Sequence, residues 1–249
     1  ATGITPPPDN LKIWVWQYGS SAPMLRRIHH PIEYNGHSPW LNYFINIGYG
    51  STATTLNDIL RYVLPDITIT KQNQYRNIYN TVSHELSHSS HFSKVGSEFW
   101  AKYVSYIMTY ASSSSPYGDG TGKNAELCGI GEMWGYFMGN ILEFEKYLST
   151  SFPNSFQDPW LCPQVLWDIY KNQLLSKKQI FECLKPEIDT YTELVQELYD
   201  KYPDQAIQIA AIINKYPKIQ HNAVLPNTNG IAYDTFIINE DINSSLTIN

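Results

Sequence analysis

Residues 71–93 read KQNQYRNIYNTVSHELSHSSHFS, and they contain the motif HELSH at residues 84–88. His84 and His88 stand four residues apart in a stretch with helical periodicity. Side chains at positions i and i+4 of an α-helix lie on one face, about 5–6 Å apart. That separation suits two imidazoles that share one tetrahedral zinc ion at ~2.0–2.1 Å from each nitrogen. We therefore predict a helix that presents both histidines to zinc.

Glu85 follows the first histidine directly. It lies about 100° around the helix from His84, so it cannot easily bind the same ion. It can reach a water molecule that the metal activates, and accept its proton. We therefore predict Glu85 as the general base of a hydrolytic reaction.

The apolar residues of this helix lie on the face opposite to the histidines. They are Tyr75, Ile78, Tyr79, Val82 and Leu86. A helix of this kind usually packs its apolar stripe on the core. We therefore expect the apolar face to be buried and the histidines to face a cleft.

His91 lies on nearly the same side of the helix as His84, but seven residues separate them by ~10.5 Å along the axis. One ion cannot bind both residues without a break in the helix. We therefore interpret His91 as a residue beside the metal ligands or the substrate, or else as an exposed one. A metzincin would need Gly at position 91 and His at position 94, and this chain has His91 and Lys94.

A catalytic zinc ion usually has three protein ligands and one open position. The third ligand is predicted to be Glu132, the only charged residue in the Gly-rich, apolar run GIGEMWGYFMG at residues 129–139. A buried carboxylate without a partner is costly, so it should bind a metal or pair with Arg or His. The glycines would let this helix approach the metal helix closely.

Three other acids are weaker candidates. Glu98 follows the motif too closely to fold back, Asp119 lies in a flexible loop, and Glu126 stands in the first turn of its helix, where an acid is expected anyway.

Hydrolysis also needs a hydrogen-bond donor for the oxyanion. Tyr110, Tyr117 and Tyr136 are candidates by position, although in a chain with 19 tyrosines each one is more often structural. Asn124, or an acid near Glu132, could orient a ligand histidine through its second ring nitrogen.

Composition excludes several other classes of protein. Hydrophobic residues make up 43% of the 249 residues, which indicates a globular chain. The net charge is −6 and no basic cluster exceeds Arg26-Arg27 or Lys177-Lys178, so we exclude a nucleic-acid partner. No apolar run approaches the ~20 residues of a transmembrane helix.

The beginning of the chain and its cysteines bear on location. The start, ATGITPPP, has no Met, basic stretch or apolar segment, so we expect a mature start after removal of an export signal. Cys128, Cys162 and Cys183 allow at most one internal disulfide, and the sequence has no Cys-x-x-Cys pair of the kind that forms a thiolate zinc site.

Strand patterns precede helical patterns, which predicts an α+β fold that is mostly helical. The expected strands are 11–18, 41–49 and 66–70, and the expected helices are 55–63, 71–93, 97–111, 125–149, 163–174, 176–184, 190–201 and 203–215. The Ser/Gly-rich loop 112–124 could form a lid or contact substrate. The expected domains are an extended leader (1–10), a catalytic core with a small sheet (11–150), a helical subdomain (151–216) and a C-terminal tail (217–249).

The HELSH motif followed by Glu132 in Gly-Glu-Met-Trp-Gly resembles the gluzincin branch of zinc peptidases. Residues 65–145 also resemble secreted or lipid-anchored zinc metallopeptidases of gut commensal bacteria. This resemblance implies a zincin-like core, zinc as cofactor, a protein or peptide substrate and an extracytoplasmic location, with any lipid anchor outside the given chain. The exopeptidase signature Gly-x-Met-Glu-Asn is absent from the sequence, which argues against an aminopeptidase.

Two alternatives stay open. The chain could be a catalytically inactive zincin, or a binding protein in which Trp14, Trp16, Tyr18 and Trp40 form an aromatic surface for peptide or glycan. A purely structural zinc would need a fourth protein ligand, for which His91 is a candidate.

Overall fold

The computed structural model describes residues 3–17, 27–28, 65–110, 117–148 and 159–226. This part of the chain is mostly helical and contains one small sheet. Strands β1 (Ile13–Trp16) and β2 (Ile67–Thr70) pair in parallel, with Ile13 opposite Ile67. This agrees with the predicted α+β class. The expected strand 41–49 and helix 55–63 lie outside the described residues.

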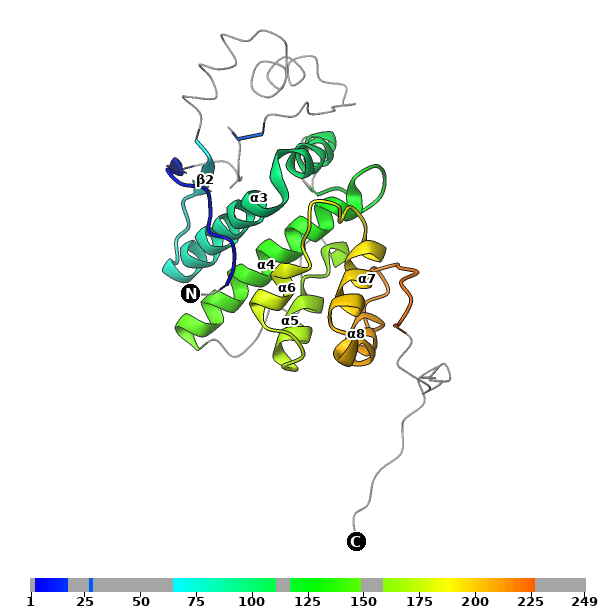
Figure 1. Cartoon of the computed structure of the whole chain (residues 1–249). Coiled ribbons are helices and arrows are strands. Elements are labelled where there is room, and N and C mark those ends of the chain that lie inside the picture. The colour runs from blue at the N-terminus through cyan, green and yellow to red at the C-terminus, as the bar shows by residue number, and fades with distance from the viewer. Residues whose placement is uncertain (1–2, 18–26, 29–64, 111–116, 149–158, 227–249) are drawn as a thin grey trace.

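Two long helices form the centre of the molecule. They are α3 (Tyr75–Tyr110) and α4 (Ala125–Tyr147), which run side by side in Figure 1. α3 consists of two helices joined at Gly96, where φ is 83° and ψ is −177°. Glycine adopts this conformation at far lower cost than any other residue. The break lies where the sequence predicts one helix to end and the next to begin.

Four shorter helices lie on the other side of α4 from α3 (Figure 1). They are α5 (Gln164–Lys171), α6 (Lys177–Glu182), α7 (Tyr191–Lys201) and α8 (Ala206–Ile213), with short 3₁₀ turns at Pro159–Leu161 and Pro203–Gln205. α6 and α7 begin with capping boxes at Ser176 and Thr190, whose hydroxyls accept hydrogen bonds from backbone N–H groups three residues later. These caps explain why both starts match the sequence prediction within one residue.

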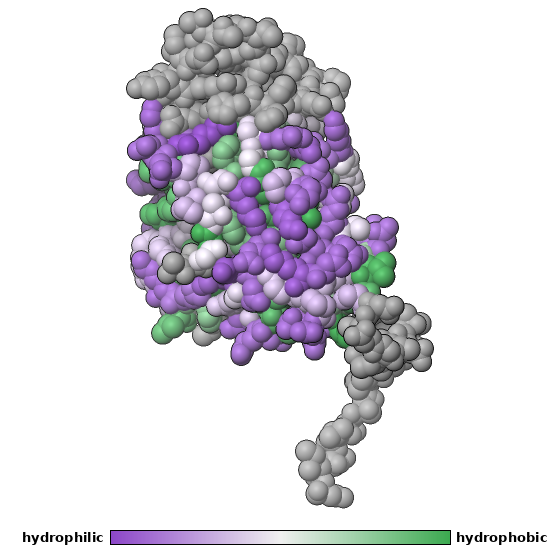
Figure 2. Space-filling view, in the orientation of Figure 1, coloured by the Kyte–Doolittle hydropathy of each residue, from purple (hydrophilic) through white to green (hydrophobic). Residues whose placement is uncertain are grey.

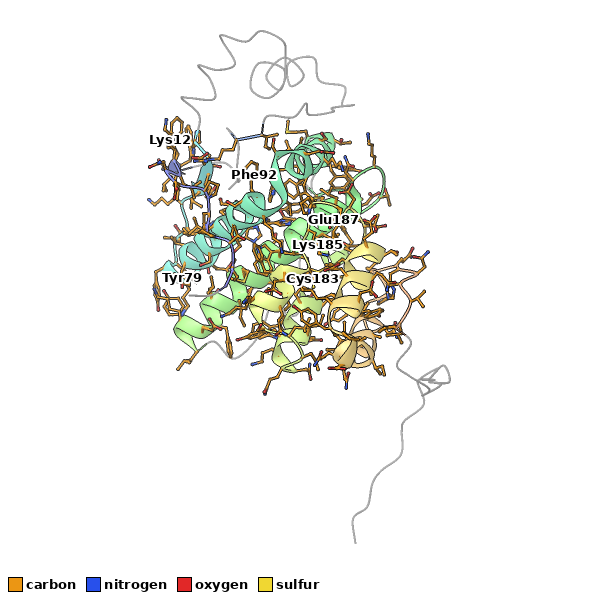
Figure 3. The ribbon with its side chains drawn as sticks, in the orientation of Figure 1. Lys12, Tyr79, Phe92, Cys183, Lys185 and Glu187 are labelled. Atoms are coloured by element: carbon orange, nitrogen blue, oxygen red, sulfur yellow. The ribbon has the colours of Figure 1, made fainter. Side chains whose placement is uncertain are left out.

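Side chains fill the space between these helices (Figure 3). One apolar cluster joins α4 to the helices α5–α8, and a second joins the later half of α3 to the beginning of α4. All three cysteines are buried thiols. On the face in Figure 2, hydrophilic residues predominate over the helices and hydrophobic ones are scattered. The predicted domain boundaries stay predictions.

Burial on the first half of α3 differs from the sequence prediction. Tyr75 and Ile78 of the apolar face are 67% and 40% exposed, whereas His84 and His88 are 8% and 1% exposed. The expectation that the apolar face packs on the core is therefore wrong for Tyr75 and Ile78, whereas Tyr79, Val82 and Leu86 are half-buried. The physical reason is that α4 lies against the histidine face, where serines offer little bulk. Ser87, for example, satisfies its hydroxyl within α3 by donating to the carbonyl oxygen of Ser83 at 2.6 Å.

Within the described ranges, no helix is both long enough and apolar enough to cross a membrane.

Candidate metal centre

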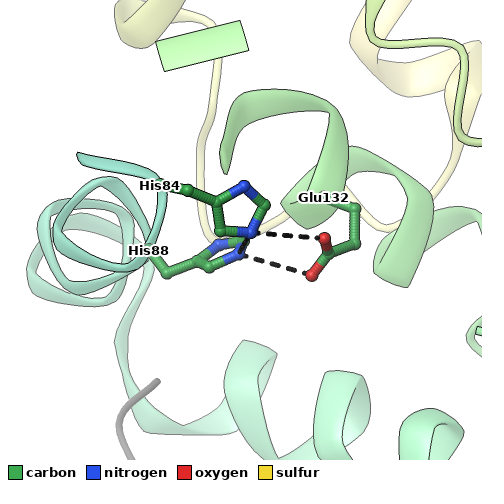
Figure 4. Close-up of side chains that lie close together, drawn as sticks. All are labelled: His84, His88 and Glu132. Carbon is green, nitrogen blue, oxygen red and sulfur yellow. Dashed lines mark hydrogen bonds and ion pairs between the residues drawn. The ribbon is translucent and has the colours of Figure 1, made fainter. Parts of the chain in front are cut away.

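The structure brings together the three residues that the sequence predicts as metal ligands. His84 and His88 project from α3 toward Glu132 on α4, as Figure 4 shows. The Nε2 atoms of the two histidines are 2.8 Å apart. Glu132 Oε2 is 3.5 Å from His84 Nε2, and Glu132 Oε1 is 3.3 Å from His88 Nε2. These ligand atoms lie within 4.8 Å of one another, so the group could hold a metal ion.

The spacing of these atoms tests whether zinc would fit. Ligand atoms ~2.0–2.1 Å from a tetrahedral zinc ion lie roughly 3.3 Å from one another. The two Nε2 atoms are 2.8 Å apart, and each lies 3.5 or 3.3 Å from the nearer oxygen of Glu132, Oε2 for His84 and Oε1 for His88, so the separations bracket that value. Two imidazole nitrogens and one carboxylate oxygen are also a ligand set that zinc commonly uses. The residues therefore fit the ion.

Glycines in α4 make the room for the two imidazoles. A Cβ at Gly135 would lie 2.6 Å from His88 Cε1 and 2.9 Å from His84 Cε1. A Cβ at Gly139, one turn later, would lie 3.1 Å from the backbone oxygen of Asn80 and 3.2 Å from His84 Cβ. Helices α3 and α4 therefore approach so closely that side chains at these positions would enter the site.

The electrostatics of the centre favour a cation. Burial opposes ionisation of Glu132, but the two nearby histidines outweigh it and hold the pKa of this carboxyl well below its usual range. Burial also disfavours the charged form of His84, but its contact with Glu132 outweighs burial and raises its pKa. For His88, burial prevails and the pKa is lowered. A buried carboxylate thus faces two ring nitrogens, and a metal ion would satisfy all three.

Glu85 is buried beside these ligands. It is 5% exposed, and its Oε2 atom has no hydrogen-bond partner among the described residues. Burial raises the pKa of Glu85 to about 8, His84 opposes the rise, and the charge of Glu132 adds to it. This pKa belongs to the centre without a cation, and a bound cation would lower it toward the ionised form that a general base needs.

Two of the three predicted tyrosine donors lie at the centre. The ring of Tyr136 is 4.6 Å from that of His84. Tyr117 is hydrogen-bonded to Tyr136, and burial together with the nearby charges of Glu132 and Glu85 raises its pKa well above the usual value. Tyr110 contacts other residues: its ring centroid is 5.1 Å from that of Tyr106, and its ring packs against Gly118.

The acids that the sequence ranks below Glu132 have partners elsewhere. Glu98 has a side chain 71% exposed and lies 3.8 Å from Lys102. Asp119 accepts hydrogen bonds from Thr121, and Glu126 accepts one from the backbone N–H of Tyr191 at 2.7 Å.

The prediction for Asn124 and one alternative for His91 need correction. Asn124 does not orient a ligand histidine, because its amide donates to the carbonyl oxygen of Lys102 at 3.3 Å. The alternative that His91 is exposed is wrong, and His91 is not among the grouped ligand atoms. Its predicted place beside the ligands is compatible with the structure, because the rings of His91 and His88 both lie against Trp100. His91 is fully buried between aromatic rings, 4.9 Å from Phe99 and 5.8 Å from Trp100, and burial lowers its pKa well below the usual value.

Sequence reasoning missed Tyr103, whose hydroxyl donates a hydrogen bond to Glu132 Oε1. Gly96 signals a break in the helical pattern, but that pattern does not give the direction in which the chain continues. The contact is therefore a tertiary feature without a local signal.

Comparison with protein families, with curated proteins and with solved structures finds no match for this chain. The likeness to gluzincins therefore depends on the motif residues themselves, and the geometry of the centre carries the functional interpretation.

Proposed function

We propose that this protein is a zinc-dependent hydrolase of peptide bonds, with the gluzincin arrangement of ligands and an extracytoplasmic location. The observation that carries the proposal is the buried group of His84, His88 and Glu132, with ligand atoms spaced for one tetrahedral ion. Glu85 supports it, because a second buried carboxyl beside a metal site suits proton transfer.

Each residue has a distinct role in the proposed reaction. Zinc in this site would supply Lewis acidity for activating water and polarising a carbonyl group. Glu85 Oε2, which has no hydrogen-bond partner in the described part of the chain, accepts the proton of the attacking water and passes it to the leaving amine. Tyr117 and Tyr136 are hydrogen-bonded to each other, so this pair has one hydroxyl proton to donate to the substrate oxygen as it gains negative charge.

The number of ligands favours catalysis over a structural role. Structural zinc sites are usually closed by four protein ligands, whereas catalytic sites use three. Among the described residues, only His84, His88 and Glu132 form such a group. His91, the predicted candidate for a fourth ligand, lies outside it.

The test compares the full chain with two variants, in zinc content and in cleavage of a peptide library. Glu85→Gln should keep zinc and lower turnover by about 10²-fold or more, since the general base is lost. Glu98→Gln is the control, because this exposed acid pairs only with Lys102 among described partners. Undiminished cleavage by zinc-loaded Glu85→Gln would remove Glu85 from its role. A zinc-loaded native chain that cleaves nothing would favour the inactive zincin.

One observation supports the binding-protein alternative. Trp14 and Trp16 on β1 are 38% and 48% exposed, and their ring centroids are 5.6 Å apart. Tyr18 and Trp40 of the predicted aromatic surface lie outside the described residues. A Trp14→Ala/Trp16→Ala variant that loses binding to a glycan or peptide array, with unchanged zinc content, would support a separate binding surface.

A further inference from the structure

Because α3 changes direction at Gly96, Tyr103 lies close to the metal centre. Tyr103 follows His88 by fifteen residues within α3, and a straight helix would separate the two by ~22 Å along its axis. Their ring centroids are only 6.1 Å apart. The later half of α3 therefore folds back toward the first half and places Tyr103 beside the ring of His88.

The ring of Tyr103 is held on two sides. Trp100 packs on it with a centroid separation of 4.6 Å. On the α4 side, a Cβ built at Gly131 would lie 3.2 Å from two ring carbons of Tyr103, which is tighter than an ordinary contact. This packing fixes the direction of the Tyr103 hydroxyl, which is buried with the carboxylate that it contacts.

The two oxygens of Glu132 consequently have different surroundings. Oε1 accepts the hydrogen bond of the Tyr103 hydroxyl and lies 3.3 Å from His88 Nε2. Oε2 is buried, lies 3.5 Å from His84 Nε2, and has no hydrogen-bond partner in the described ranges. One oxygen is therefore anchored to the protein, while the other is available to a cation.

We propose that Tyr103 is a positioning residue, which holds Glu132 through Oε1 so that Oε2 is the atom that binds the metal. Outer hydrogen bonds of this kind set the orientation of ligand side chains and contribute strongly to metal affinity. This inference depends on the metal site of the proposed function, but not on peptide hydrolysis.

The test measures the zinc dissociation constant of the full-length chain with Tyr103→Phe. This change removes one hydroxyl and keeps the packed ring. We expect zinc binding to weaken by about 10- to 100-fold. The matched control is Tyr216→Phe, because Tyr216 also donates to a carboxylate, Asp168 Oδ2, at 2.6 Å. The control should lose a comparable hydrogen bond and keep native zinc affinity.

Cobalt substitution gives a second readout. Without the Tyr103 hydroxyl, the carboxylate can rotate and bind through both oxygens, so the visible absorption of the Co²⁺ form should change in Tyr103→Phe and not in Tyr216→Phe. Should Tyr103→Phe fail to fold, Gly131→Ala displaces the same ring by a few tenths of an ångström and should also weaken zinc binding.

The outcomes separate the two proposals. Native zinc affinity and an unchanged cobalt spectrum in Tyr103→Phe would overturn the role of Tyr103 and leave the proposed hydrolase intact. A native chain that binds zinc, shows the expected loss in Tyr103→Phe and cleaves no peptide would overturn the hydrolase and support Tyr103. A native chain without zinc affinity would overturn both.

Discussion

Replacement of Gly135 by alanine should damage metal binding more than it damages folding. The new Cβ would lie 2.6 and 2.7 Å from His88 Cε1 and Nε2, and 2.9 Å from His84 Cε1, where ordinary contacts begin at 3.4 Å. The imidazoles or the helix must therefore move by about 0.5–0.8 Å. Metal–ligand distances tolerate only about ±0.2 Å. We expect zinc affinity to fall by at least about tenfold, or ~1.4 kcal/mol.

The same substitution should change the stability of the metal-free chain only moderately. Overpacking of a closely packed contact costs about 1–3 kcal/mol, and the better helix propensity of alanine offsets about 1 kcal/mol of that. The net loss is therefore about 0–2 kcal/mol, measurable by urea unfolding with a chelator present.

Gly129→Ala on the same helix is the matched control for this prediction. Its Cβ would clash with the Tyr191 hydroxyl and would lie 3.0 Å from the Trp160 ring, away from the histidines. It should lower stability and keep zinc affinity, as measured by competition with a chromophoric chelator. Native zinc affinity in Gly135→Ala would show that the helices are not as close as the structure indicates, and the reasoning would fail.

Two further predictions concern the same centre. Free zinc at a hundredfold excess over its dissociation constant should stabilise the native chain by about 2.7 kcal/mol, which for a chain of this size raises Tm by roughly 5–11 °C. Glu132→Gln should abolish most of that rise in a calorimetric scan. An equal rise in the variant would contradict Glu132 as a ligand. Gly96→Ala should lower the free energy of unfolding by about 1–3 kcal/mol, because its Cβ meets no atom within 4 Å and the cost is that of the backbone conformation alone. The control is Gly122→Ala, which is also at positive φ with an open Cβ position and should show a backbone cost but no loss of zinc affinity. Equal zinc affinity in the two variants would show that the break at Gly96 does not affect the metal centre.

The metal ligands were predictable because each has a local signal. The four-residue spacing of His84 and His88 indicates a shared helix face, and Glu132 is conspicuous as the one charge in an apolar run. The helix starts at Ser176 and Thr190 were predictable for a similar reason, because each has a capping box, a pattern that spans only four residues of sequence.

The direction in which the metal helix faces was not predictable from its hydrophobic pattern. That pattern assigns Tyr75 and Ile78 to the core, but the close approach of α4 buries the polar face instead. Tyr103 could not be found for the same kind of reason, because its contact depends on how two helices meet across the Gly96 break. Local periodicity describes one element at a time, and these features belong to pairs of elements.

The spacing of glycines along α4 has a consequence for how such a centre is inherited. Gly131, Gly135 and Gly139 recur every four residues beside Tyr103, the histidine rings and Asn80. A descendant that kept both histidines and the acid, but gained ordinary side chains at these three places, would hold its donor atoms too far apart to share an ion. These glycines are therefore as necessary to the centre as its ligands. A search for related chains should require the pattern Gly-Glu-x-x-Gly-x-x-x-Gly after the paired histidines.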